Sequence, residues 1–179
     1  TVPVGLAGVV MIAAGPNHSV ALTSNGTVVP WRYNDNGQTN VPVGLTNVVM
    51  IACGLNHSLA LKADGNVVAW GFNGYGQTNV PAGLTNVVAV AGGGLHSLAL
   101  KSDGRVIAWG DNHFVGQTNV PVNLTNVVAI AAGNLHSLAL KSDGTVVAWG
   151  DNYYGQTNAP AGLTNVLAIA GGWNHSLAL

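Results

Sequence analysis

The sequence predicts an all-β fold, a β-propeller of three-stranded antiparallel blades, and three observations lead to this prediction. A His-Ser pair recurs in steps of 39, 39, 40 and 39 residues, and periods of this size are typical of solenoids, propellers and arrays. Each period contains three short runs of strand-forming residues. The first run ends in very small residues, and the third run contains a tryptophan. The repeated histidines are His18, His57, His96, His136 and His175.

The period divides the chain into repeat units within one propeller segment, residues 1–179. Four units are complete, and the fifth contains two of the three expected strands, so we expect the ring to be incomplete within this chain. One residue is inserted in the third unit, near "DNHFVGQ". The units are residues 1–40, 41–79, 80–119, 120–158 and the partial unit 159–179.

Within the second unit, the three expected strands are "VVMIACG" (48–54), "HSLALKA" (57–63) and "NVVAWGF" (66–72). These runs are too short for helices and rich in residues that favour strands. Asp64-Gly65 separates the second run from the third, and this pair is typical of a two-residue hairpin turn with positive φ. We therefore expect antiparallel strands, joined by glycine- and proline-rich loops such as "NGYGQTNVPAGLTN".

The distribution of side-chain sizes favours a propeller over a solenoid. Blades around an axis are crowded at the centre and diverge outward, so small residues belong at the hub and large residues at the perimeter. The first strand ends in small residues in every copy, as in Ala52-Cys53-Gly54. Pro30 replaces an alanine in the first tryptophan strand, and proline suits an edge strand. We expect the outer strands to carry the following tryptophans as fillers between blades: Trp31, Trp70, Trp109 and Trp149.

Two stretches of the repeat carry a resemblance to known families. Each copy reads approximately GxNHSLALKxDGxVxAWGxNxxGQ, which resembles the repeat of the regulator-of-chromosome-condensation superfamily over essentially the whole chain. The strings "AWGDN..GQT..VP" and "V.AIA.G..HSLALK.DG" look most similar to the secreted, propeller-type bacterial β-lactamase inhibitory proteins. The first resemblance implies a β-propeller. The second implies a secreted protein that binds other proteins and catalyses nothing.

Composition excludes several classes of partner. The chain has 179 residues, is 48% apolar, and carries 5 basic and 6 acidic residues for a net charge of −1. It offers no basic stripe for a phosphate backbone, so we expect no nucleic-acid partner. It contains neither a polybasic anchor nor an apolar run of about 18 residues, so we expect no membrane insertion. Cys53 is the single cysteine, which excludes an internal disulfide.

Candidate catalytic and metal-binding groups are better explained by structure. A catalytic His-Ser pair needs a third orienting group and occurs once per fold, whereas five copies in one phase indicate a structural role. We expect each imidazole and hydroxyl to bond backbone groups at the start of the second strand. The histidines lack neighbouring cysteine or carboxylate ligands, and the sequence has no glutamate for a glycosidase pair. The prediction is a protein with no catalytic residue, metal or cofactor.

Candidate binding residues lie where the copies differ. The loops after the tryptophan strands differ most, followed by the position between the glycine and the histidine. Exposed aromatic residues there would provide a large contact area at low entropic cost, although they could instead cover neighbouring blades. The candidates are Tyr33, Phe72, Tyr75, His113, Phe114, Tyr153, Tyr154 and Trp173.

Asn-x-Ser/Thr sequons recur along the chain and would accept sugars on a glycosylating secretory route. Three of them are by-products of the repeated Asn-His-Ser string. The sequons begin at Asn17, Asn25, Asn56, Asn123 and Asn174.

These observations favour a secreted, non-catalytic propeller module that recognises another protein through aromatic loops. An alternative is a structural, self-assembling extracellular protein. The fifth unit leaves an open strand edge, which pairs with another copy to form a ring or filament unless the chain is part of a longer array. A further alternative is a lectin that binds glycans between blades.

Overall fold

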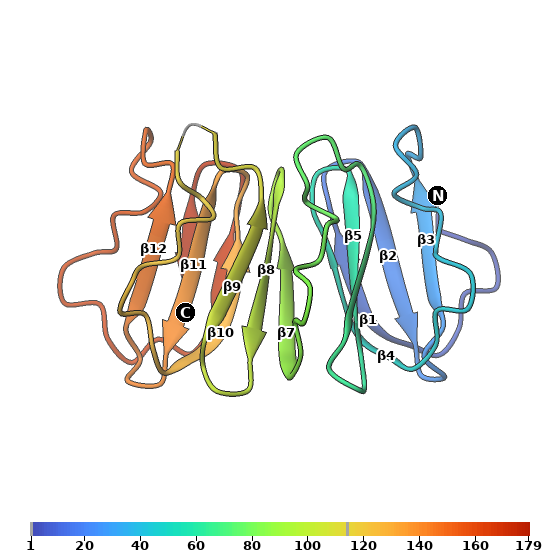
Figure 1. The fold of residues 1–179 in the computed structure, drawn as a ribbon, viewed down its shortest axis with the longest axis horizontal. Coiled ribbons are helices and arrows are strands. Elements are labelled where there is room, and N and C mark those ends of the chain that lie inside the picture. The colour runs from blue at the N-terminus through green and yellow to red at the C-terminus, as the bar shows by residue number, and fades with distance from the viewer. Residues whose placement is uncertain (1, 114) are drawn as a thin grey trace.

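The computed structural model describes residues 2–113 and 115–179, and in this part of the chain the strands form four three-stranded antiparallel sheets and one two-stranded sheet (Figure 1). We call the sheets blades 1 to 5, each with an inner, a middle and, in blades 1 to 4, an outer strand. The inner strands are β1 (Val9–Ala14), β4 (Val48–Cys53), β7 (Val87–Gly92), β10 (Val127–Ala132) and β13 (Ile169–Gly171). The middle strands are β2 (His18–Thr23), β5 (His57–Lys62), β8 (His96–Lys101), β11 (His136–Lys141) and β14 (Ser176–Ala178). The outer strands are β3 (Val28–Arg32), β6 (Val67–Gly71), β9 (Val106–Gly110) and β12 (Val146–Gly150). The predicted fold class, with four complete blades and two strands of a fifth, is confirmed.

The hairpin between the middle and outer strands differs from the predicted two-residue turn. Gly65 N donates to Lys62 O at 2.9 Å, and Lys62 N donates to Asn66 O at 2.9 Å, which encloses three loop residues. Gly65 has φ of 79°, whereas Asp64 does not have a positive φ. Asp64 instead accepts a hydrogen bond from Asn66 N at 3.0 Å through its side chain. The turn is therefore a type I turn followed by a glycine bulge, while the antiparallel pairing is as expected.

Small residues line the axis, as the taper argument predicted. Inner strands of successive blades pack on one another, and their ends surround a cavity of about 330 Å³ lined by residues such as Gly54, Gly93 and Gly133. A side chain at Gly93 would collide with the His96 imidazole and would lie 2.8 Å from Gly133 O. Cys53 is half-buried at this cavity, and burial raises the pKa of its thiol to about 12.

The tryptophans lie on the outer strands and pack between blades. Trp70, Trp109 and Trp149 are 7%, 7% and 8% exposed, and each belongs to a hydrophobic core shared with the preceding blade. Trp31, in blade 1, is only half-buried. Pro30 lies on β3, which is the outermost strand of its blade, as predicted.

The two ends of the blades differ in chemistry. Loops that follow the outer strands lie at the top of Figure 1, on the same end as the turns between inner and middle strands, because Phe72 N donates to Asn56 O at 2.8 Å. We call this end the loop face. The opposite end carries the Asp-Gly hairpins with their exposed ion pairs, for example Lys62 with Asp64 at 3.1 Å. In the described residues, no helix is long and apolar enough to cross a membrane.

Candidate functional site

The repeated His-Ser pair connects neighbouring blades. His57 Nε2 lies 3.0 Å from Ser97 Oγ in the next blade, and Ser97 Oγ donates to Gln77 O at 2.9 Å. Trp109 Nε1 donates to the same carbonyl at 2.9 Å. The other His–Ser contacts are His18–Ser58 at 2.8 Å, His96–Ser137 at 2.9 Å and His136–Ser176 at 3.1 Å.

This network leaves the serines unsuited to nucleophilic catalysis. The hydroxyl hydrogen of Ser97 is engaged by a carbonyl, so the imidazole Nε2 must carry a proton and donate to the serine oxygen. A general base would need the opposite arrangement. The expectation that each serine bonds the backbone is confirmed. The expectation for the histidines was wrong, since the imidazoles bond the serine of the next blade, about 40 residues away.

Burial keeps these histidines neutral. His57 and His96 are fully buried, and desolvation lowers the pKa of His57 to about 3 and that of His96 to about 4. Neither Nδ1 atom has a hydrogen-bond partner in the described part of the chain. Within residues 2–113 and 115–179, no three His, Cys, Asp or Glu side chains are grouped so that they could hold a metal ion.

The buried glutamines are functional residues of the framework that the sequence analysis missed. Gln77 is fully buried, its Oε1 accepts from Tyr75 N at 3.0 Å, and its carbonyl receives the bonds from the next blade. Asn73 Nδ2 donates to Asn79 Oδ1 at 2.8 Å and closes the same loop. The signal was the string "GQTN", which recurs after every outer strand. These bonds hold the loop in one shape and fix where Tyr75 is presented.

Three of the predicted aromatic residues meet across blades 2 and 3. The ring centroids of Phe72 and Tyr75 are 6.1 Å apart, and those of Tyr75 and His113 are 6.0 Å apart, both in edge-to-face orientation. We call these three residues the aromatic row. Tyr75 is 45% exposed and the His113 side chain 67%, while Phe72 is half-buried. The row therefore offers apolar surface to solvent across a blade junction.

The other predicted aromatic residues do not join this row by any described ring contact. Tyr153 and Tyr154 form their own edge-to-face pair in blade 4, with centroids 4.8 Å apart, and both are exposed. Tyr33 is exposed in blade 1, and Trp173 is exposed at the mouth of the axial cavity. Phe114 lies outside the described residues.

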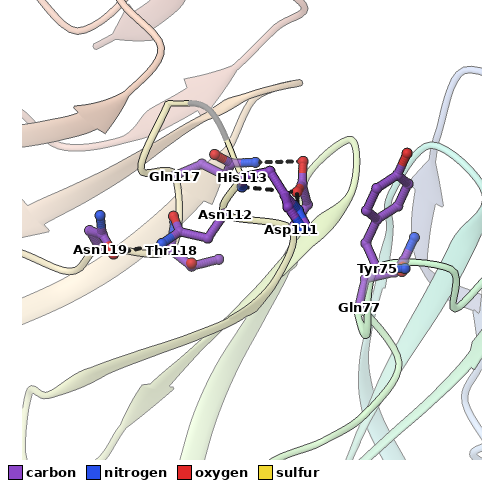
Figure 2. A network of polar contacts seen from close by, with 8 residues as sticks. All are labelled: Tyr75, Gln77, Asp111, Asn112, His113, Gln117, Thr118 and Asn119. Carbon is purple, nitrogen blue, oxygen red and sulfur yellow. Dashed lines mark hydrogen bonds and ion pairs between the residues drawn. The ribbon is translucent and has the colours of Figure 1, made fainter.

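A buried carboxylate supports His113 from below (Figure 2). Asp111 Oδ1 lies 2.6 Å from His113 Nδ1, and Asp111 Oδ2 accepts from Gln117 Nε2 at 3.1 Å. Burial alone would raise the pKa of Asp111, but the hydrogen bonds from His113 and Gln117 hold it below its usual value. Figure 2 shows Tyr75 reaching toward this group from the neighbouring blade. The imidazole is thus oriented at the end of the aromatic row.

The sequons occupy two kinds of position. Asn25 and Asn123 are exposed in loops. Asn17, Asn56 and Asn174 are half-buried, and Asn17 Nδ2, the atom that would carry a sugar, donates to Asn56 Oδ1 at 2.8 Å. Glycosylation stays a prediction, and the folded structure favours the two loop positions.

Comparison with protein families decides the relationship of the repeats. Residues 9–38, 48–77, 87–117 and 127–156 each match the Regulator of chromosome condensation (RCC1) repeat. The chain belongs to the RCC1 repeat family. No curated protein matches this RCC1-repeat chain.

Solved structures with the same fold include two of yeast RCC1 (Prp20). The structure of Kap60 bound to yeast RCC1 gives a TM-score of 0.78 at 23% identity, over 94% of this chain and 52% of that one. Prp20p from Saccharomyces cerevisiae gives 0.77 at 24% identity, over 95% and 55%. The ectodomain of the Physcomitrella patens receptor kinase CR4 gives 0.70 at 26% identity, over 90% and 44%. These likenesses show the fold, and the chain spans about half the length of each structure. None of the three is a β-lactamase inhibitory protein, and that narrower resemblance remains a prediction.

Proposed function

We propose that this RCC1-repeat chain is a non-catalytic module that recognises another protein through its loop face. The observation that carries the proposal is the aromatic row, which places Phe72, Tyr75 and His113 in contact across two blades. Aromatic residues held in a fixed orientation give a large contact area at a small entropic cost on binding. The contact is built from two different loops, so only the folded propeller presents it.

The rest of the polar framework supports a binding role over catalysis. The histidines, serines and glutamine carbonyls that recur in each repeat are engaged with one another between blades, as His57, Ser97 and Gln77 illustrate. The residues that vary between repeats are those left exposed on the loop face, including Tyr33, Tyr75 and Tyr153. Variation at exposed loop positions on a constant scaffold is the arrangement expected of a recognition surface.

The structural neighbours are consistent with a protein partner. Yeast RCC1 was crystallised bound to Kap60, and Prp20p is described with its binding properties to Gsp1p and histones. The CR4 neighbour is a receptor ectodomain, which supports an extracellular setting as part of the proposal. A narrower form of the proposal, based on the sequence resemblance, is inhibition of a β-lactamase by the loop face.

The test is affinity capture followed by quantitative mass spectrometry, using the intact chain as bait against a secreted-protein fraction. The loop-face variant carries Tyr75→Ala and His113→Ala, and the matched control carries Lys62→Ala and Lys141→Ala on the opposite end. We expect a protein that is captured by the wild type and the control but lost at least about tenfold with the loop-face variant, as expected for loss of hot-spot residues. Equal capture of every partner by both variants would exclude the loop face as the recognition surface.

The inhibitor form has its own test. Titration of the chain into a β-lactamase reaction measures inhibition directly, with the loop-face variant as control. Inhibition by the wild type that the variant lacks would support this form. Unchanged hydrolysis at micromolar concentrations of the chain would reject it while leaving recognition of other proteins to the capture experiment.

A further inference from the structure

Blade 5 presents an unpaired strand edge. In blade 4, β11 is paired with β10 on one side and with β12 on the other. In blade 5, β14 is paired with β13, and no other described strand lies along its second edge. Leu177 on β14 is 60% exposed, whereas its counterparts Leu98 and Leu138 are 0% and 1% exposed.

A hydrogen-bond acceptor beside this edge has one donor fewer than its counterparts. Gln77 O accepts from Ser97 Oγ and from Trp109 Nε1, and Gln117 O accepts from Ser137 and Trp149 in the same way. Gln156 O accepts from Ser176 Oγ at 2.6 Å, and no described indole donates to it. Because a carbonyl oxygen can accept two hydrogen bonds, this one retains acceptor capacity.

The space next to the edge has the size and lining that an indole requires. A cavity of about 460 Å³ lies between blade 4 and β14, and its walls include Ala159, Leu163 and Leu177. In the junction between blades 2 and 3, the counterparts Val80 and Leu84 pack in the hydrophobic core that holds Trp109. The same apolar positions are therefore present in blade 5 without the tryptophan that they pack against elsewhere.

From these three observations we propose that the outer edge of β14 is a strand-acceptor site. Its ligand is an extended segment with the Val-Val-Ala-Trp-Gly pattern of an RCC1-repeat outer strand, supplied by a second polypeptide. The four described outer strands of this chain cannot supply it without leaving their own blades, because each is paired with its own middle strand. Addition of a strand to an open sheet edge is a common mode of peptide recognition, in which the main chain gives affinity and side-chain pockets give specificity.

The register of the bound segment follows from blade 4. There Ser137 lies opposite Trp149, Leu138 opposite Ala148, and His136 opposite Gly150. The bound segment therefore runs antiparallel to β14 with its tryptophan opposite Ser176 and the preceding alanine opposite Leu177. In this register the indole N–H donates to Gln156 O. A shift of one residue would turn the tryptophan to the opposite face of the sheet.

The first experiment measures binding of a synthetic peptide by isothermal titration calorimetry. The peptide has the sequence DGTVVAWGDN, residues 143–152 of this chain, and the matched control carries Trp149→Ala. We expect the peptide to bind the intact chain and the control to bind at least about tenfold more weakly, since the control loses both the packing and the donor. No binding at about 1 mM, or equal binding of both peptides, would overturn the proposal.

The second experiment tests the register by disulfide trapping. The chain carries Leu177→Cys together with Cys53→Ala, which removes the native thiol, and the peptide carries Ala148→Cys. We expect this pair to form a mixed disulfide at least about tenfold faster than a peptide with Val147→Cys, because adjacent residues of a strand point to opposite faces. Equal trapping rates for the two peptides would contradict the proposed register and with it the site.

Discussion

At the scale of single residues, the buried histidines show how a polar group can be part of a core. His57 is fully buried, and its Nε2 is 3.0 Å from Ser97 Oγ, but its Nδ1 has no partner in the described residues. A neutral imidazole tolerates this, because one ring nitrogen then needs no donor function. A charged imidazole would bury a second N–H without an acceptor, and this penalty is what lowers the pKa.

Acidification should therefore destabilise the protein before its carboxylates are protonated. The folded pKa values of about 3 for His57 and about 4 for His96 lie below the ordinary 6.5, so the unfolded chain binds protons first as the pH falls. Each of these two histidines should lower the free energy of unfolding by about 2 kcal/mol between pH 6.5 and pH 5. Urea denaturation at pH 7 and pH 5 measures the loss. His57→Gln should reduce the loss, and equal stability of the wild type at both pH values would contradict the prediction.

A second residue-scale prediction concerns the buried amide of Gln77. Its Nε2 has no acceptor in the described structure, whereas Gln156 Nε2 donates to Asp151 at 2.9 Å. Phe72 occupies the position that Asp151 holds in blade 4. Phe72→Asp should therefore be about 1 kcal/mol more stable than Phe72→Ala, which removes the same ring without adding an acceptor. Urea denaturation of the two variants decides the matter, and identical midpoints would count against the explanation.

At the scale of elements, the inner strands are constrained by their approach to the axis. The turn after each inner strand brings a glycine against the imidazole of its own blade and the backbone of the next. At Gly93 an added Cβ would meet His96 and Gly133 O, while at Gly83, in a loop, it would meet nothing within 4 Å. The two glycines thus separate steric crowding from the backbone preference, since Gly83 has φ of +74°.

We expect Gly93→Ala to destabilise the protein by about 3 kcal/mol, because the neighbours are a buried ring and a main-chain carbonyl that cannot move independently. Gly83→Ala should cost about 1 kcal/mol, which is the penalty for a side chain at positive φ. Thermal or urea unfolding of both variants provides the comparison. A cost at Gly83 equal to that at Gly93 would show that crowding at the hub is unimportant.

At the scale of the whole molecule, each blade contacts mainly its immediate neighbours. Hydrophobic cores lie between blades 1 and 2, between blades 2 and 3, and between blades 3 and 4. Blade 5 contributes exposed residues such as Leu167 and Leu177 instead of a core of this size. In such arrays, stability is close to a sum of repeat and interface contributions, so it varies along the chain.

Hydrogen exchange measured by mass spectrometry should show this variation. The amides of β5 and β8, which lie between two cores, should exchange at least about tenfold more slowly than those of β13 and β14. Exchange in β2 should be intermediate, because blade 1 has a neighbour on one side in the described structure. Uniform protection across all five blades would indicate a single cooperative unit and contradict the additive view.

Much of this architecture was predictable from residue patterns. The strand positions around His57 and Trp70 followed from strand-forming runs, and the order from hub to perimeter followed from the sizes of Gly54 and Trp70. The turn at Asp64 was predicted one residue too short, because its geometry depends on the Asp64 side chain bonding Asn66 N. The aromatic candidates came from variation between copies. Their grouping into a row depended on how loops of two blades approach, which no single repeat encodes.

The sequence by itself determined the period, the three strands of each blade, and which strand lies at the axis, because these depend on local strand preference and on side-chain size. Only the tertiary structure decided which polar atoms meet. His57 and Ser97 are 40 residues apart, and a repeat pattern shows that both recur without showing that they face each other. That pairing arises when one blade packs on the next, since burial then requires each donor to find an acceptor across the junction.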